Sequence, residues 1–282
     1  MSATTIDVSP LATDLQAQDP DRYLSTLFAS SSLRPALFAL YAFDHEIARI
    51  RRVVREPMAG LIRLQWWRDA LDAIGKGEVL AHPVVEGLSE ACLRHDLDRQ
   101  LLLTAIDARE RDWDETPPRD CEALEHHLSA ANGSIVKAAA TLIGHHEPEL
   151  LRIADQIGVG LGLLERLTWL AAEPTEDPPA CTPGSLLLEH GLIDSGTGGQ
   201  GQSDLADRDE IDKIRQILRR RAQHHLSMAR QGHYKVPRQL LPAFFPGTLA
   251  EIRLRNLDRS RNHPALATAP YRLLWHWLCG RF

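Results

Sequence analysis

Residues 39–56 read ALYAFDHEIARIRRVVRE, and this stretch decides the fold that the sequence predicts. Its apolar side chains recur every three to four residues, which is typical of an amphipathic helix. Asp44, His45 and Glu46 form a polar cluster within it. Successive helical residues diverge by about 100°, so at most two of the three can face one cavity. Such charge runs are most often solvated faces, and the simplest interpretation is a set of salt bridges with the neighbouring arginines.

The same helical periodicity extends along the whole chain, and strand-like alternation is nearly absent. Proline in the first turn and glycine at the end mark several helices. The predicted helices are residues 35–55, 57–75, 83–95, 98–113, 121–130, 134–144, 148–172, 207–232, 238–244 and 264–279, with a short helix at 184–192. A proline-rich acidic stretch at 174–183 and a glycine/serine stretch at 194–204 are predicted to be loops. We find no internal repeat.

Composition favours one all-α domain. Of 282 residues, 44% are hydrophobic and 25% are charged, and the net charge of −6 gives no general nucleic-acid footprint. Four well-separated cysteines predict reduced thiols. No stretch reaches the roughly 18 apolar residues of a membrane span, and the first twenty residues resemble neither a signal nor a presequence. We expect a cytoplasmic protein with a flexible N-terminus at 1–18 and one domain at 19–282.

The helix at 39–56 resembles the first substrate helix of the squalene/phytoene synthase family, the head-to-head prenyl-diphosphate synthases. In that family the tyrosine of the same YAF segment is followed by aspartates, which hold Mg²⁺ against a prenyl diphosphate. The aligned positions here are Ala48, Arg49 and Arg52. Mg²⁺ at a phosphate site usually needs at least one or two carboxylates, so this face is not expected to bind it. The resemblance places Tyr41 and His45 in the lining of the substrate cavity.

The second acidic motif of the family has also lost most of its carboxylates in this chain. Its counterpart is GLLERLTWLAAE, residues 162–173, where Trp169 stands at the first aspartate and Glu165 at an asparagine. Only Glu173 keeps a carboxylate, at the last aspartate. The basic segment that follows in the family is replaced by EPTEDPPACTPG, which contains neither lysine nor arginine. We therefore predict no metal site and no cofactor, with Mg²⁺ required only if the chain is an active transferase.

The remaining segments resemble the family in order and spacing from about residue 19 to residue 233. They include DRYLSTLFASSSLRPALFALYAF, LQWWRDALDAI, AIDARERDWDE and HLSAANGSIVKAAATLIG. The segments ALYAFDHEIARI, LQWWRDAL and HYKVPRQLLPAFFP are most similar to a branch with eroded aspartate motifs. That branch comprises bacterial relatives of a mitochondrial complex I assembly factor. The resemblance implies an isoprenoid-synthase helical bundle around a central cavity.

Arg49 and Arg52 allow two interpretations. They lie three residues apart on one helix face, and guanidinium groups can bind a phosphate without a metal, as in a lipid head group or an isoprenoid diphosphate. Alternatively they form ion pairs with Glu165 and Glu173 on the opposite helix, which would close the site electrostatically. We favour the closed site.

Other conspicuous residues have plainer interpretations. Trp66 and Trp67 predict core packing, and Asn132 with its neighbours predicts helix capping. The histidine pairs at 126/127, 145/146 and 224/225 lack a chelating spacing. The C-terminal APYRLLWHWLCGRF predicts either an interfacial membrane helix or the last core helix.

The sequence leaves two main hypotheses for the function of the protein, and a lipid carrier is a third. The first is a non-catalytic protein that acts through a protein partner or the membrane surface, as in complex I assembly, and is either cytoplasmic or peripheral on the inner membrane. The alternative is a transferase that condenses isoprenoid diphosphates, or a protein that binds an isoprenoid or lipid ligand. The candidate residues of the vestigial cavity are Tyr41, His45, Arg49, Arg52, Glu165, Trp169 and Glu173.

Overall fold

Proline starts many of the helices of this chain, as the sequence predicts. It lies in the first turn of α3 (Arg34–Val53), α4 (Pro57–Gly75), α5 (Pro83–Arg94) and α9 (Pro148–Ala171). Its fixed backbone angle suits that turn, and its missing N–H would have no partner there. The computed structural model describes residues 9–113, 118–171, 208–231, 236–256 and 269–279.

Every regular element within these ranges is a helix, which confirms the predicted all-α fold. The remaining elements are α1 (Pro10–Gln18), α2 (Pro20–Thr26), α6 (Arg99–Glu110), the 3₁₀ turn η1 (Arg111–Trp113), α7 (Cys121–Leu128), the π-helical turn η2 (Ser129–Gly133), α8 (Ser134–Leu142), α11 (Arg208–Gln231), the 3₁₀ turn η3 (Arg238–Leu240), α12 (Leu241–Asn256) and α13 (Ala269–Cys279). The short helix predicted at 184–192 and both predicted loops lie outside the described residues.

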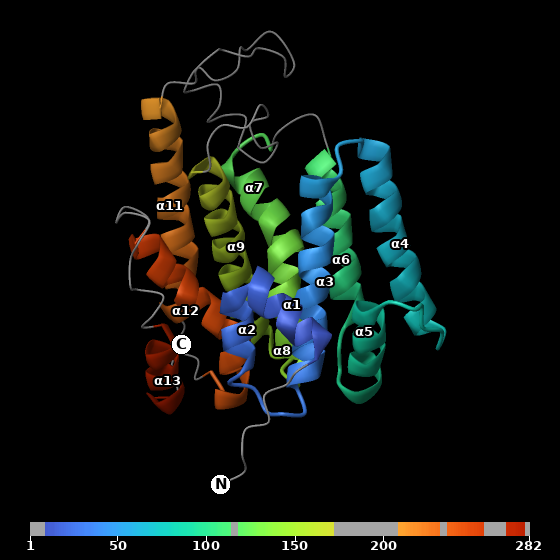
Figure 1. Cartoon of the computed structure of the whole chain (residues 1–282). Helices are drawn as coiled ribbons and strands as arrows, with labels where there is room; N and C mark the ends of the chain where they lie inside the picture. Colours follow the sequence, from blue (N-terminus) through green and yellow to red (C-terminus); the bar gives the residue numbers. More distant parts are fainter. Residues whose placement is uncertain (1–8, 114–117, 172–207, 232–235, 257–268, 280–282) are drawn as a thin grey trace.

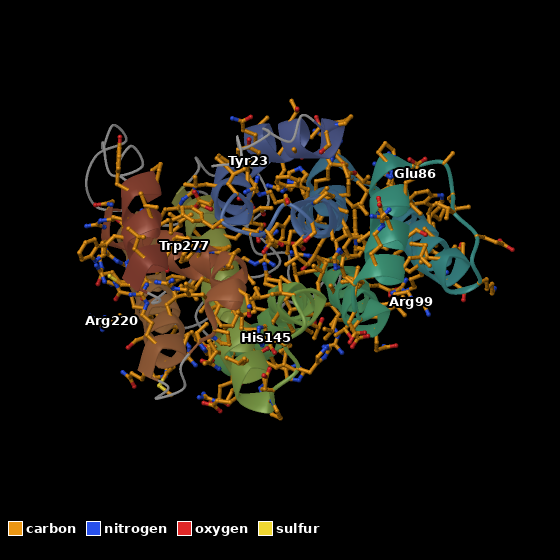
Figure 2. The ribbon with its side chains drawn as sticks, turned by 90° about the horizontal axis from the view of Figure 1, so that it is seen from below. Tyr23, Glu86, Arg99, His145, Arg220 and Trp277 are labelled. Carbon is orange, nitrogen blue, oxygen red and sulfur yellow. The ribbon has the colours of Figure 1, made fainter. Side chains whose placement is uncertain are left out.

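The long helices stand roughly side by side, with α4 at one edge of the bundle and α11 at the other (Figure 1). The core is built around α3, whose Leu37, Phe38, Leu40 and Phe43 are fully buried. Seen from below, Glu86 on α5 and Trp277 on α13 lie on opposite sides of the molecule, and side chains fill the space between the helices (Figure 2). The junction of α3 and α4 lies at the upper end of Figure 1, whereas α13 lies at the lower end.

The structure corrects three predictions of local structure. Residues 10–18, expected to be flexible, form α1, and its Ala12 and Leu15 are buried in the core. The helix predicted at 238–244 continues as α12 through Pro246 to Asn256, because nearly all of its side chains are buried and tertiary packing outweighs the local cost of proline. The helix predicted at 98–113 ends at Glu110 and continues as η1.

Candidate functional site

The predicted cavity residues on α3 begin with Tyr41, which is fully buried. The Arg22 guanidinium from α2 lies 5.1 Å from the centre of its ring. Burial raises the pKa of the Tyr41 hydroxyl far above its ordinary value, although the Arg22 charge opposes that rise. Tyr41 is therefore a neutral phenol packed beneath a cation.

His45, Arg49 and Arg52 follow on later turns of α3. Burial and the nearby Arg52 lower the pKa of His45, so its imidazole is neutral at pH 7. The Arg49 Nη1 donates to Glu46 Oε1 at 3.1 Å, in a pair between neighbouring turns of the same helix. Arg52 is exposed. Of the predicted α3 residues, only Tyr41 is fully buried.

The opposite helix, α9, presents Glu165, which is half-buried. Among the described ion pairs, Arg49 pairs with Glu46 and neither arginine pairs with Glu165. This half of the predicted electrostatic closure is wrong: Arg49 is paired within α3, and Arg52 is exposed. The side chain of Trp169 and the whole of Glu173 lie outside the described part of the chain.

Charged residues outside the predicted set of cavity residues occupy the centre of the bundle. Arg22 Nη1 donates to Asp44 Oδ2 at 2.5 Å, and Arg109 Nη2 of α6 lies 3.8 Å from Asp44 Oδ1. Arg109 also lies 3.6 Å from Asp112 Oδ2. Asp112 in turn contacts two further groups. We refer to all six residues as the buried charge network: Arg22, Asp44, Arg109, Asp112, His127 and Arg166.

Asp112 is the hub of this network at the end of α6. Its Oδ1 lies 3.0 Å from His127 Nε2 on α7 and 3.6 Å from Arg166 Nη2 on α9. Burial alone would raise the pKa of Asp112, but the hydrogen bond from His127 and the charges of Arg109 and Arg166 lower it to about 2. The carboxylate is thus permanently ionised at neutral pH and is held by cations.

Asp44 shows why this interior does not fit a divalent cation. One of its oxygens accepts from Arg22, and the other faces the Arg109 guanidinium without a hydrogen bond. A hard cation would have to displace both arginines to reach it, since Mg²⁺ needs several oxygen ligands. No group of three His, Cys, Asp or Glu side chains suited to a metal occurs in the described residues. The network links α2, α3, α6, η1, α7 and α9.

The segment predicted as a capped helix junction is instead a continuous π-helical turn, η2, between α7 and α8. The α9 helix packs directly against it: a Cβ on Gly158 would lie 2.4 Å from Gly133 Cα. Asp155 accepts from Ser129 Oγ at 2.6 Å and pairs with Lys137 Nζ at 2.7 Å. The capping prediction is wrong, because Asn132 is buried in this seam and neither Gly133 nor Ser134 begins a new helix with a side-chain cap.

The histidine pairs make ordinary protein contacts. His127 belongs to the buried charge network. His225 Nε2 lies 3.2 Å from Glu125, and its Nδ1 lies 2.8 Å from the amide oxygen of Gln156. Burial would raise the pKa of Glu125, but the hydrogen bonds from His225 and Arg221 lower it to about 2. These contacts join α7 and α9 to α11.

The C-terminal aromatic segment forms α13, which has two different faces. Leu273 is fully buried against α12, and the Arg238 guanidinium lies 5.6 Å from the centre of the Trp277 ring. Arg238 Nη2 also donates to the Leu278 carbonyl at 2.5 Å. The outward positions are apolar and exposed: Tyr271, Leu274, Trp275 and Leu278. One face therefore completes the core, and the other is an exposed aromatic stripe.

Trp66 and Trp67 also differ from each other. Trp67 is buried, as predicted, whereas 38% of Trp66 is exposed. No helix in the described residues is long and apolar enough to cross a membrane.

Comparison with known proteins gives one family and two kinds of relative. The squalene/phytoene synthase profile matches residues 15–277. Proteins named NADH dehydrogenase (ubiquinone) complex I, assembly factor 6, from Bos taurus and Homo sapiens are each 27% identical to this chain. These alignments cover 89% and 87% of this chain, and 75% and 72% of the two relatives.

Two solved structures share the fold. A dehydrosqualene synthase crystallised with a ligand superposes with a TM-score of 0.70 at 14% identity, over 95% of each chain. A squalene synthase from Alicyclobacillus acidocaldarius gives a TM-score of 0.61 at 17% identity, over 88% of this chain and 92% of the other. At these identities the likeness establishes the helical bundle and nothing about the reaction.

Proposed function

This chain belongs to the squalene/phytoene synthase family, and from that premise we propose that it is a non-catalytic member that acts in respiratory complex I assembly. The observation that carries the proposal is its likeness, along most of its length, to relatives named for that role. The protein would act by binding partners, because the chemistry of the family requires groups that this chain has replaced.

The chemical argument concerns the leaving group. Ionisation of an allylic diphosphate requires stabilisation of the departing pyrophosphate, which metal ions normally supply. Ala48, Arg49 and Arg52 stand at the first metal face, and Arg49 is engaged by Glu46. Asp44 is likewise neutralised by arginines, so it offers no substitute ligand.

Two measurements test the proposal. Deletion of the gene in its host should reduce assembled complex I on native gels and spare the other respiratory complexes. The purified protein should release no pyrophosphate from farnesyl or geranylgeranyl diphosphate with Mg²⁺, compared with a heat-killed control. Unchanged complex I would contradict the assembly role, and metal-dependent pyrophosphate release would contradict the loss of chemistry.

We also propose that the protein is peripheral on the membrane and that the outward face of α13 makes this contact. Tryptophan and tyrosine favour the membrane–water interface, and a short amphipathic helix can lie within it. Tyr271 and Trp275 project from α13, and Arg272 adds a cation beside them.

Point substitutions test this contact better than truncation, because truncation would also remove the buried Leu273. Trp275→Glu should reduce co-sedimentation with vesicles that contain phosphatidylglycerol and leave the melting temperature nearly unchanged. Leu93→Glu is the matched control, since Leu93 is an exposed leucine on α5. Normal vesicle binding by a folded Trp275→Glu protein would refute the α13 contact.

A further inference from the structure

A second exposed apolar surface lies where α3 meets α4. Val53 is the last residue of α3. On α4, Met58, Ile62 and Trp66 lie four residues apart along the outer face of the helix. Met58 and Ile62 are among the most exposed large apolar side chains described, at 69% and 62%. Because residues four apart share a helix face, these side chains form one continuous stripe. We call the stripe and the arginines around it the α3–α4 corner.

The corner is held in a fixed shape by the residues beneath it. The Arg51 guanidinium lies 4.8 Å from the centre of the Trp113 ring, and its Nε donates to the Asp112 carbonyl at 3.1 Å. The same ring fills the space beside Gly60, where a Cβ would lie 2.0 Å from it. The start of α4 is therefore locked onto η1 and the end of α3.

Trp66 is also fixed. Its ring packs edge-on against Trp67, at a centroid distance of 4.9 Å, and against His82 at 5.4 Å. A partly exposed aromatic side chain that is already ordered loses little entropy on binding, and rigid aromatic anchors of this kind dominate many protein interfaces.

The charges around the stripe indicate what would cover it. Arg52, Arg55 and Arg63 are exposed, and none forms an ion pair with any residue that the structure describes. Glu56 is the one acidic residue between Arg52 and Arg63. This local excess of positive charge contrasts with the net charge of −6 for the whole chain. A complementary surface would be apolar at its centre and acidic at its rim.

We propose that the α3–α4 corner docks an acidic amphipathic helix of a protein partner. Apolar side chains spaced three to four residues apart on that helix would pack along Met58, Ile62 and Trp66, while its carboxylates would meet Arg52, Arg55 and Arg63. The inference rests on the proposed function, because an assembly factor must hold a protein. An amphipathic helix commonly binds by packing its apolar face along an apolar stripe of this kind. Methionine suits such a surface because its flexible side chain adapts to different apolar partners.

A protein helix fits this corner better than a membrane does. The aromatic stripe of α13 lies at the lower end of the bundle in Figure 1, and the corner lies at the upper end. A flat bilayer that contacts α13 cannot also contact the corner. The corner also lacks exposed tyrosine, and its tryptophan is packed sideways against other rings instead of projecting outward.

The first experiment uses the full chain in its host cell, with the photo-crosslinking amino acid p-benzoylphenylalanine in place of Ile62. The control carries the same amino acid in place of Leu93, the exposed leucine of α5. We expect a crosslink from position 62 to one defined polypeptide segment, mapped by mass spectrometry. That segment should be an amphipathic helix with several Asp or Glu residues. Crosslinks to lipid alone, to a second copy, to a segment without that pattern, or to nothing would overturn the proposal.

The second experiment separates the apolar and charged parts of the surface. In a Met58 photo-crosslinking chain, Ile62→Glu and Arg63→Glu should each lower the yield of the same crosslink about tenfold or more, and Leu93→Glu should not change it. High salt should weaken the crosslink, because it screens the arginines. Equal yields from all variants would overturn the proposal.

These readouts do not depend on complex I. If gene deletion leaves complex I intact but the acidic helix still crosslinks, the proposed function fails and the docking surface stands. If deletion abolishes complex I but the corner captures no such helix, the docking surface fails and the assembly role stands. Loss of vesicle binding in Ile62→Glu would show that the corner faces a membrane, which also contradicts the inference.

Discussion

At the scale of single residues, the interior of this protein is notable for paired charges. Asp44 and Arg109 are almost fully buried, and their side chains lie within 3.8 Å of each other. Removing one member of a buried pair leaves the other charged and desolvated, which costs far more than breaking a surface pair. The buried charge network should therefore be a strong determinant of stability.

We predict that Asp44→Asn lowers the free energy of unfolding by about 3 to 5 kcal/mol, because Arg22 and Arg109 lose their shared carboxylate. Urea denaturation would measure this loss. Glu46→Gln is the control, since Glu46 pairs with Arg49 on the half-exposed side of the same helix. That change should cost less than about 1 kcal/mol. Similar losses in the two variants would mean that burial does not govern the energy of these pairs.

Asp112 predicts a dependence of stability on pH. Its pKa falls from 3.8 to about 2 on folding, so the folded state favours the ionised form. The corresponding stability, about 2 kcal/mol, is fully present above about pH 5 and is lost as pH falls toward 2. Urea denaturation between pH 6 and pH 2 should show this decline, with a shallower slope in Asp112→Asn. If the free energy of unfolding fell equally with pH in the unmodified protein and in Asp112→Asn, Asp112 would not be the group responsible.

At the scale of secondary-structure elements, the sequence predicted most helices but not all of their boundaries. Proline at helix starts and apolar periodicity located α3, α4, α5 and α9 to within a few residues. Two features of the structure were not predicted from local sequence patterns. The helix α12 contains Pro246 and Gly247, and it persists because the surrounding core buries both. In the η2 turn, Asn132 and Gly133 resemble a helix end, yet α9 packs on the turn and holds the chain helical.

The candidate site was predicted less well for a related reason. The helix frame placed Tyr41 in the interior, and the structure places it there. The partners of Asp44 come from α2 and α6, which are 22 and 65 residues away in the sequence, and no local pattern links positions so far apart. The alignment positions of the family also drew attention to Arg49 and Arg52 and away from Arg22 and Arg109. Long-range ion pairs of this kind become visible only in three dimensions.

The seam between α9 and η2 gives a prediction for one glycine. A Cβ on Gly158 would lie 2.4 Å from the backbone of Gly133, and no side-chain rotation can relieve a clash between backbones. We expect Gly158→Ala to lower the melting temperature markedly, with a loss of about 1 to 3 kcal/mol or more.

The control for this prediction lies two residues further along the same helix. The atoms nearest to a Cβ on Gly160 would belong to the side chain of Leu226, at 2.7 Å, and a side chain can shift more readily than the backbone that faces Gly158. Gly160→Ala should therefore cost less than Gly158→Ala, and it also gains the better helix propensity of alanine. The reverse order in thermal denaturation would mean that the seam yields more easily than the packing around Leu226.

At the scale of the whole molecule, the fold of a prenyl synthase is kept while its interior is held by internal ion pairs. The surfaces that remain for interaction lie outside the bundle. The α13 stripe and the α3–α4 corner occupy opposite ends of it (Figure 1), and Figure 2 shows α5 and α13 on opposite sides of the molecule. With the two contacts proposed above, the family fold would serve as a rigid body that presents two separate binding faces.

The length of α3 sets the distance between the two ends of the bundle. Its 20 residues rise by about 1.5 Å each, so the helix spans about 30 Å from the lower to the upper part of the bundle. A bilayer beneath α13 and a partner helix on the corner would be kept apart by roughly that length. The protein would act as a spacer, and it would select partner segments that stand well clear of the lipid surface over those that lie along it.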